Sequence, residues 1–206
     1  MKKHLFFSIF LLLTFSVFAQ KRHDEVLVKT PTDTLKKIRF KIDPSVEYLT
    51  PSHTYRNIQT TSINIWGGAE FFRKTPLTIC GGITATYAWG NIKQWGNNFQ
   101  EVTYKNQAFG IGPAFLLRFE PFVYKGFSIA PEVSLGVILY TQHFPYGGDI
   151  YNFMSRVGGS INYHINKKYA VNLNGKWMHV SNGQGFSEHN PSYEGWGFGV
   201  GFARYF

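Results

Sequence analysis

Phe127–Leu139 reads FSIAPEVSLGVIL, with an apolar side chain at every odd position and mostly small or polar residues between them. Successive side chains of a β-strand point to opposite faces, so this period of two predicts a strand that is apolar on one face. Four other segments repeat the pattern. Their apolar odd positions run from Ile63 to Phe71, Leu77 to Trp89, Phe109 to Phe119 and Tyr151 to Tyr163. The sequence therefore predicts an all-β protein.

The connections between the segments alternate in length. Short connections are predicted at 73–76, 120–125 and 165–167, and longer ones at 91–104, 141–148 and 182–193. Short turns at one end and long loops at the other are the pattern of outer-membrane barrels, which have an even number of strands. Seven strands are recognisable from Gln59 onward, and Val46–Leu49 is the best core for one more. We predict an eight-stranded antiparallel transmembrane β-barrel with short periplasmic turns and longer extracellular loops.

A soluble β-sandwich or a lipocalin-like barrel also alternates, with its apolar residues turned inward. Long apolar faces with almost no charge, glycines on the opposite face and aromatic residues near the strand ends favour the membrane barrel. The aromatic residues meant here are Trp66, Trp89, Tyr140, Trp177, Trp196 and Tyr205. Aromatic residues make up 18% of the chain and charged residues only 16%, which also favours a lipid-facing surface.

The beginning of the chain has the features of a signal peptide. Two lysines precede an apolar run over residues 5–18, and Val17 and Ala19 are the small residues before a predicted cleavage at Gln20. The run is too short to span a bilayer as a helix. We predict a signal peptide at 1–19, a polar periplasmic extension at 20–42 and the barrel at 43–206.

The chain is basic, with a formal net charge of +9. An exported protein rarely meets nucleic acid, so no nucleic-acid partner is predicted; a solvated basic surface and contact with anionic lipid head groups both stay open. The single Cys80 cannot form an internal disulfide, and no Cys or His spacing indicates a metal site. No metal or other cofactor is predicted.

Three polar residues extend the apolar face of the last two predicted strands. His179 and Ser181 lie on the odd face of the strand that begins at Tyr169, and Glu194 begins the even, apolar face of the final strand. A symmetric hairpin would place Ser181 opposite Glu194 and His179 opposite Trp196. Because polar groups on a lipid-facing wall are unfavourable, three of them together indicate a function.

These residue types suit ester hydrolysis. A serine hydroxyl becomes a nucleophile when an imidazole takes its proton, and a carboxylate on the other ring nitrogen orients the imidazole. Asn182 and Asn190 flank the trio and are candidates for the oxyanion donor. Taken singly, His179 is equally an interfacial aromatic residue and Glu194 a loop-end charge. The other histidines of the predicted barrel are predicted to be turn or loop residues: His53, His143, His164 and His189.

The segments His179-Val-Ser181-Asn182 and Asn190-Pro-Ser-Tyr-Glu194, followed by a strand of glycines and aromatics, resemble the PagL-type lipid A 3-O-deacylases. The resemblance covers roughly the last thirty residues, and Ser192 stands where the family often has glycine. It implies an eight-stranded outer-membrane barrel that removes an ester-linked acyl chain from lipid A. It also implies roles: Ser181 as nucleophile, His179 as base, Glu194 as orienting acid and Asn190 as oxyanion donor.

The same resemblance implies the surroundings of the protein. The substrate would be lipid A of lipopolysaccharide, in the outer membrane of a Gram-negative bacterium, with the active site facing the outer leaflet. Outer-membrane lipid and the barrel-assembly machinery are expected partners, the latter because Phe206 resembles its recognition signal. A homodimer is left open. The alternatives are a non-catalytic structural or adhesion barrel and an outer-membrane phospholipase.

Overall fold

The computed structural model describes residues 39–71, 76–95, 100–183 and 190–206. The predicted signal peptide and most of the predicted extension lie outside the described residues. The strands are β1 (Arg39–Pro51), β2 (Arg56–Phe71), β3 (Leu77–Trp95), β4 (Glu101–Phe119), β5 (Phe122–Tyr124), β6 (Phe127–Tyr140), β7 (Tyr151–His164), β8 (Tyr169–Ser181) and β9 (Tyr193–Tyr205). No helix in this part of the chain is long and apolar enough to cross a membrane.

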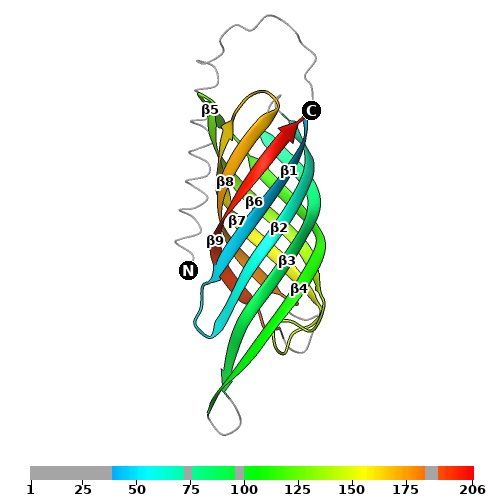
Figure 1. The fold of residues 1–206 in the computed structure, drawn as a ribbon, viewed down its shortest axis with the longest axis vertical. Coiled ribbons are helices and arrows are strands. Elements are labelled where there is room, and N and C mark those ends of the chain that lie inside the picture. Colours follow the sequence, from blue (N-terminus) through cyan, green and yellow to red (C-terminus); the bar gives the residue numbers. More distant parts are fainter. Residues whose placement is uncertain (1–38, 72–75, 96–99, 184–189) are drawn as a thin grey trace, which may run out of the picture. The chain divides into compact units, whose positions relative to one another are not determined.

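Eight of the strands form a closed antiparallel barrel (Figure 1). Neighbours in sequence pair with one another, β4 pairs with β6, and β1 pairs with β9 to close the sheet. The short strand β5 pairs only with β6, in the turn that follows β4. The predicted eight-stranded antiparallel barrel is therefore confirmed, and β5 is an addition to it.

Three strand ends differ from the sequence prediction. The first strand begins at Arg39, whereas the barrel was predicted to begin at residue 43. The connection predicted at 91–104 is mostly strand, because β3 continues to Trp95 and β4 begins at Glu101. Only β4 pairs with the end of β3, so this hairpin projects beyond the end of β2 (Figure 1).

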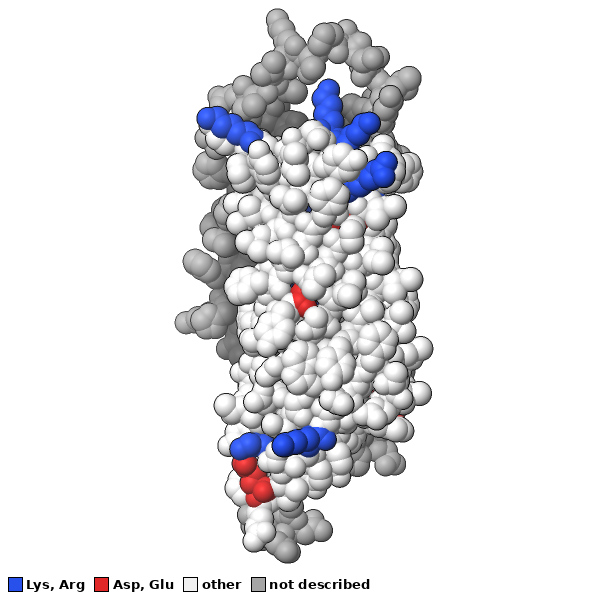
Figure 2. Space-filling model, viewed as in Figure 1, with Lys and Arg blue, Asp and Glu red and all other residues white. Residues whose placement is uncertain are grey.

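The outward face of the barrel is apolar, as the period of two predicted. Phe198 and Phe202 are exposed on it, and Trp177 points the same way, while Gly197, Gly199 and Gly201 alternate with them. Figure 2 shows a broad middle band on this side of the barrel that is almost free of charged side chains, with lysine and arginine gathered above and below it. This surface matches the apolar interior of a bilayer.

Three of the aromatic residues predicted at the membrane interface lie inside the barrel. Trp66, Tyr140 and Tyr205 are almost fully buried. Trp66 occupies an even position of β2, so its ring turns inward, where Gly82 leaves room: a Cβ there would lie 2.7 Å from the Trp66 ring. The prediction of an interfacial role for these three residues was wrong, because strand parity outweighs nearness to a strand end.

Paired charges fill much of the interior. Arg118 donates from Nε to Glu132 Oε1 at 2.6 Å and from Nη1 to Asp43 Oδ2 at 2.9 Å. Lys176 Nζ donates to Glu47 Oε1 at 2.7 Å. All five side chains are at most 5% exposed. Buried charges are tolerated when they are paired, and these pairs link β1, β4, β6 and β8 across the interior.

Aromatic side chains pack inside the barrel near its loop end. Tyr140 and Tyr193 share a hydrogen bond between their hydroxyls at 2.5 Å, and the ring of Phe144 contacts both. Met178 and Val180 of β8 belong to the same buried cluster. The inward face of the last hairpin is thereby fixed, and the residues between these anchors point outward.

Candidate active site

His179 and Glu194 lie directly opposite each other on β8 and β9. His179 Nδ1 and Glu194 Oε1 are 3.1 Å apart and form a hydrogen bond. The predicted hairpin register was wrong by two residues, because Trp177 rather than His179 faces Trp196. A shift of two residues keeps every side chain on its own face, so the trio stays on the outward wall.

Buried neighbours hold the two strands at this point. Met178 and Val180 flank His179 on the inward side of β8, and Tyr193 precedes Glu194 on the inward side of β9. His179 and Glu194 themselves are only partly covered, with side chains 33% and 28% exposed. Trp177 stacks on His179, with ring centroids 5.9 Å apart. The imidazole therefore lies between an aromatic ring and a carboxylate on the outer surface.

Ser181 follows His179 by two residues on the same face of β8 and is half-buried. Two residues of a strand span about 7 Å, which two side chains leaning together can bridge. Within the described part of the chain, the Ser181 hydroxyl makes no hydrogen bond to His179. Glu194 occupies Nδ1 of the imidazole, which leaves Nε2 as the nitrogen to accept a proton. This is the arrangement of a base oriented by its acid.

Asn182 and Asn190 meet across the last loop. The backbone N–H of Asn182 donates to Asn190 Oδ1 at 2.8 Å. The Asn182 side chain is buried and its Nδ2 donates to the Tyr151 carbonyl at 3.0 Å, so it faces away from the outward wall. Asn190 is half-buried, with Nδ2 available as a donor. The structure thus gives Asn182 a supporting position and leaves Asn190 as the side-chain amide that can serve the site.

The model of the lipid A 3-O-deacylase (PagL) family matches residues 78–203. This chain belongs to that family. The match spans more than half of the chain and includes β8 and most of β9, with His179, Ser181, Asn190 and Glu194. As a PagL-family member, the protein is a lipid A deacylase of the outer membrane.

The solved structure of a PagL enzyme supports the barrel fold. The crystal structure of the outer membrane enzyme PagL matches with a TM-score of 0.53 and 15% identity, over 77% of this chain and 97% of that one. The crystal structure of Neisserial surface protein A (NspA) matches with a TM-score of 0.45 and 12% identity, over 82% and 97%. No curated protein matches the sequence.

A second histidine reaches the site from outside the PagL-family match. His53 lies in the turn between β1 and β2, and its Nε2 is 3.3 Å from Glu194 Oε2. His53 thus lies in a turn, as predicted, and in addition contacts the carboxylate of the predicted trio. Residues 53 and 194 are far apart in sequence, and only the pairing of β1 with β9 brings them together. This contact could be predicted only by knowing how β1 pairs with β9 where the barrel closes.

The other histidines do not join the PagL-type trio. His164 ends β7 and bonds Glu120 Oε1 at 3.1 Å, so its prediction as a loop residue was wrong. His143 lies in the β6–β7 loop and bonds the Gly148 carbonyl at 3.0 Å. His189 lies outside the described residues. Among those that are described, no group of three or more His, Cys, Asp or Glu side chains is placed to hold a metal ion.

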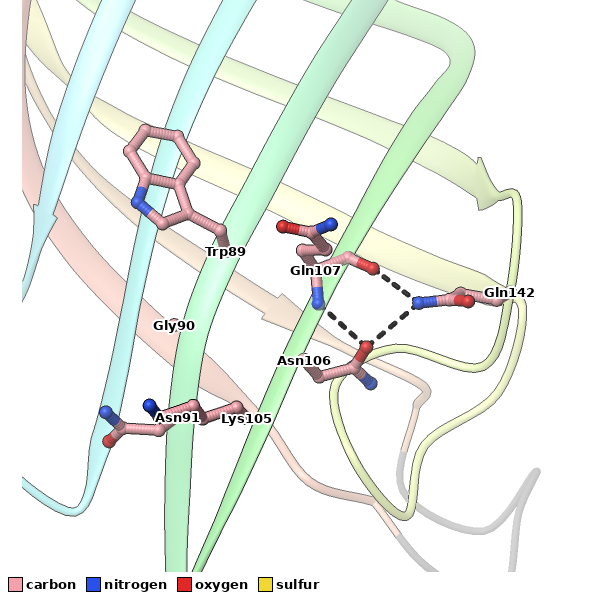
Figure 3. A pocket seen from close by; sticks show the side chains of 7 residues that line it. All are labelled: Trp89, Gly90, Asn91, Lys105, Asn106, Gln107 and Gln142. Carbon is pink, nitrogen blue, oxygen red and sulfur yellow. Dashed lines mark hydrogen bonds between the residues drawn. The ribbon is translucent and has the colours of Figure 1, made fainter.

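A hollow beside the projecting β3–β4 hairpin is a different feature (Figure 3). It is lined by Trp89, Gly90, Asn91, Lys105, Asn106, Gln107 and Gln142. Gln142 Nε2 donates to Asn106 Oδ1 at 3.0 Å, which ties the β6–β7 loop to β4 (Figure 3). The lining has no serine, histidine or carboxylate, so the hollow lacks the groups of a hydrolase centre.

Proposed function

We propose that this protein is a serine esterase that removes the acyl chain from the 3-O position of lipid A. The observation that carries the proposal is the His179–Glu194 hydrogen bond on the outward wall, with Ser181 beside it on the same face. Ser181 is the nucleophile, His179 the base and Glu194 the orienting acid. Family membership supports the substrate, and the residue types support the chemistry.

The reaction proceeds in two halves. His179 Nε2 takes the proton of the Ser181 hydroxyl as its oxygen attacks the ester carbonyl, and Glu194 stabilises the imidazolium that forms. The intermediate collapses to an acyl-serine, and the imidazolium gives its proton to the sugar oxygen that leaves. Water, deprotonated by His179, then attacks the acyl-serine and releases the fatty acid with Ser181 restored.

The outward position of the trio supports a substrate that lies in the membrane. A shallow apolar hollow indents the same wall, farther from the long-loop end than the site. It lies where Gly159 of β7 and Gly175 of β8 pair without side chains. Leu173 and Phe198 border it, so a fatty acyl chain would find an apolar surface there. After export through the predicted signal peptide, the long-loop end would face outward. Lipid A of the outer leaflet would then reach Ser181 laterally.

The decisive test is the mass of lipid A from one host that expresses either the wild type or Ser181→Ala. Wild type should lower the mass by one ester-linked hydroxyacyl chain and release that fatty acid, whereas Ser181→Ala should leave lipid A intact. Both proteins must run as folded barrels, judged by the heat-dependent shift in gel mobility. Loss of a chain with folded Ser181→Ala would remove the serine from the mechanism. Release of fatty acid from phospholipid alone would instead favour the phospholipase.

Asn190 offers a second test, because its two amide atoms have separable roles. Asn190→Asp keeps the oxygen that accepts from the Asn182 N–H but removes the Nδ2 donor, so the loop contact should persist while oxyanion binding is lost. We expect kcat to fall by ~100-fold or more in Asn190→Asp and also in Asn190→Ala. The measurement is fatty-acid release by the purified variants. Wild-type kcat in Asn190→Asp would limit Asn190 to holding the loop.

A further inference from the structure

The turn after β1 is fastened to the segment that carries Glu194. Pro51 of β1 pairs with Gly195 of β9, so the chain leaving β1 passes alongside Glu194. The Ser52 N–H donates to the Glu194 carbonyl at 3.0 Å. Arg56 Nη1 donates to the Ser192 carbonyl at 2.8 Å and to Ser192 Oγ at 2.6 Å. The turn therefore contacts the Glu194 segment on both sides of His53.

His53 uses this position to reach the second carboxylate oxygen. Its Nε2 lies 3.3 Å from Glu194 Oε2, while His179 Nδ1 lies 3.1 Å from Oε1. One carboxylate thus bridges two imidazoles, one on the neighbouring strand β8 and one in the β1–β2 turn. A partly exposed glutamate with a single partner keeps rotamer freedom, and a second hydrogen bond, here from a His53 side chain that is 61% exposed, restricts it. The oxygen that faces His179 is then held in place.

We propose that His53 is a positioning residue of the reaction, which donates from Nε2–H to Glu194 Oε2 and so keeps Oε1 on His179. The inference rests on the proposed roles of Glu194 and His179. His53 lies in the β1–β2 turn, outside the family match over 78–203. It acts through Glu194 and touches no reacting atom.

The first test is steady-state hydrolysis of purified lipid A by His53→Ala and His53→Gln. Loss of one partly exposed hydrogen bond to a carboxylate should lower kcat about two- to fivefold in His53→Ala, with KM unchanged, because His53 does not bind substrate. Glutamine carries an amide donor at a similar reach, so His53→Gln should restore most of kcat. His143→Ala, which removes another loop histidine of the β6–β7 connection, is the matched control and should have wild-type kcat.

A double-variant cycle separates positioning from other roles. In a Glu194→Ala background, which retains a measurable rate, adding His53→Ala should cause no further loss, since His53 then has nothing to position. A loss of kcat that persists without Glu194, an effect confined to KM, or wild-type kcat in His53→Ala would each overturn the inference. Ser181→Ala is run in parallel: if it is active, the proposed function fails, whereas an inactive Ser181→Ala with an unaffected His53→Ala rejects only the positioning role.

Discussion

His179→Ala should lower kcat for lipid A deacylation by ~10⁴-fold or more, as far as Ser181→Ala does. Without the imidazole, the Ser181 hydroxyl loses its proposed proton acceptor, and at neutral pH a hydroxyl is a poor nucleophile. Because the two residues act in one step, the double variant should be no slower than either single variant. Glu194→Gln should retain more activity than both, since it removes only the group that orients the base.

Single-turnover release of fatty acid from purified lipid A measures these rates, and an active-site-directed fluorophosphonate reports on Ser181 separately. The probe should label wild type and fail to label Ser181→Ala, with much slower labelling of His179→Ala. If the fold losses of the two single variants multiplied in the Ser181→Ala, His179→Ala double variant, the two residues would act independently. That result would contradict a shared proton transfer.

Arg118→Leu should destabilise the barrel by ~3–5 kcal/mol, because it leaves two buried carboxylates without their main partner. Arg118 is the link between Asp43 of β1 and Glu132 of β6, which face each other across the interior. Leucine fills part of the space but neutralises neither carboxylate. Urea unfolding in detergent micelles, followed by tryptophan fluorescence, gives the free energy of unfolding.

The matched control is an exposed ion pair of similar length. Lys93 Nζ lies 2.7 Å from Glu101 Oε1 on the projecting hairpin, against 2.6 Å for Arg118 and Glu132, but both of its side chains are more than a third exposed. Water and salt already satisfy such charges, so Lys93→Met should leave the unfolding midpoint unchanged. Equal effects of Arg118→Leu and Lys93→Met would show that burial does not determine how much these ion pairs contribute to the free energy of unfolding.

Much of the barrel could be predicted because each strand has one lipid-facing side. The period of two placed Phe198 and Phe202 outward and the final glycines inward, and both assignments are confirmed. The same rule did not identify the start of β1, where Lys41 and Asp43 alternate with Phe40 and Ile42. Charges that fill an interior look like a polar extension until their partners on other strands are known.

The face of the barrel that carries the site could be predicted from the sequence, but the contacts between the site residues could not. Parity alone put His179, Ser181 and Glu194 on one wall, but it could not fix which residues stand opposite, because a shift of two residues preserves every face. The hairpin register depends on the packing of Tyr193 and its neighbours beneath the loop. His53 needed still more, namely the closure of β1 on β9.

That closure has a consequence for the timing of activity. The contacts of Ser52 and His53 with Glu194 cross the seam between β1 and β9, so they can form only when that seam is joined. A chain whose final hairpin has formed while the seam is open already carries its serine and imidazole, but its acid has only one of its two partners. Full hydrolytic activity would then be reached only when β1 pairs with β9 and the closed barrel lies in the lipid it acts upon.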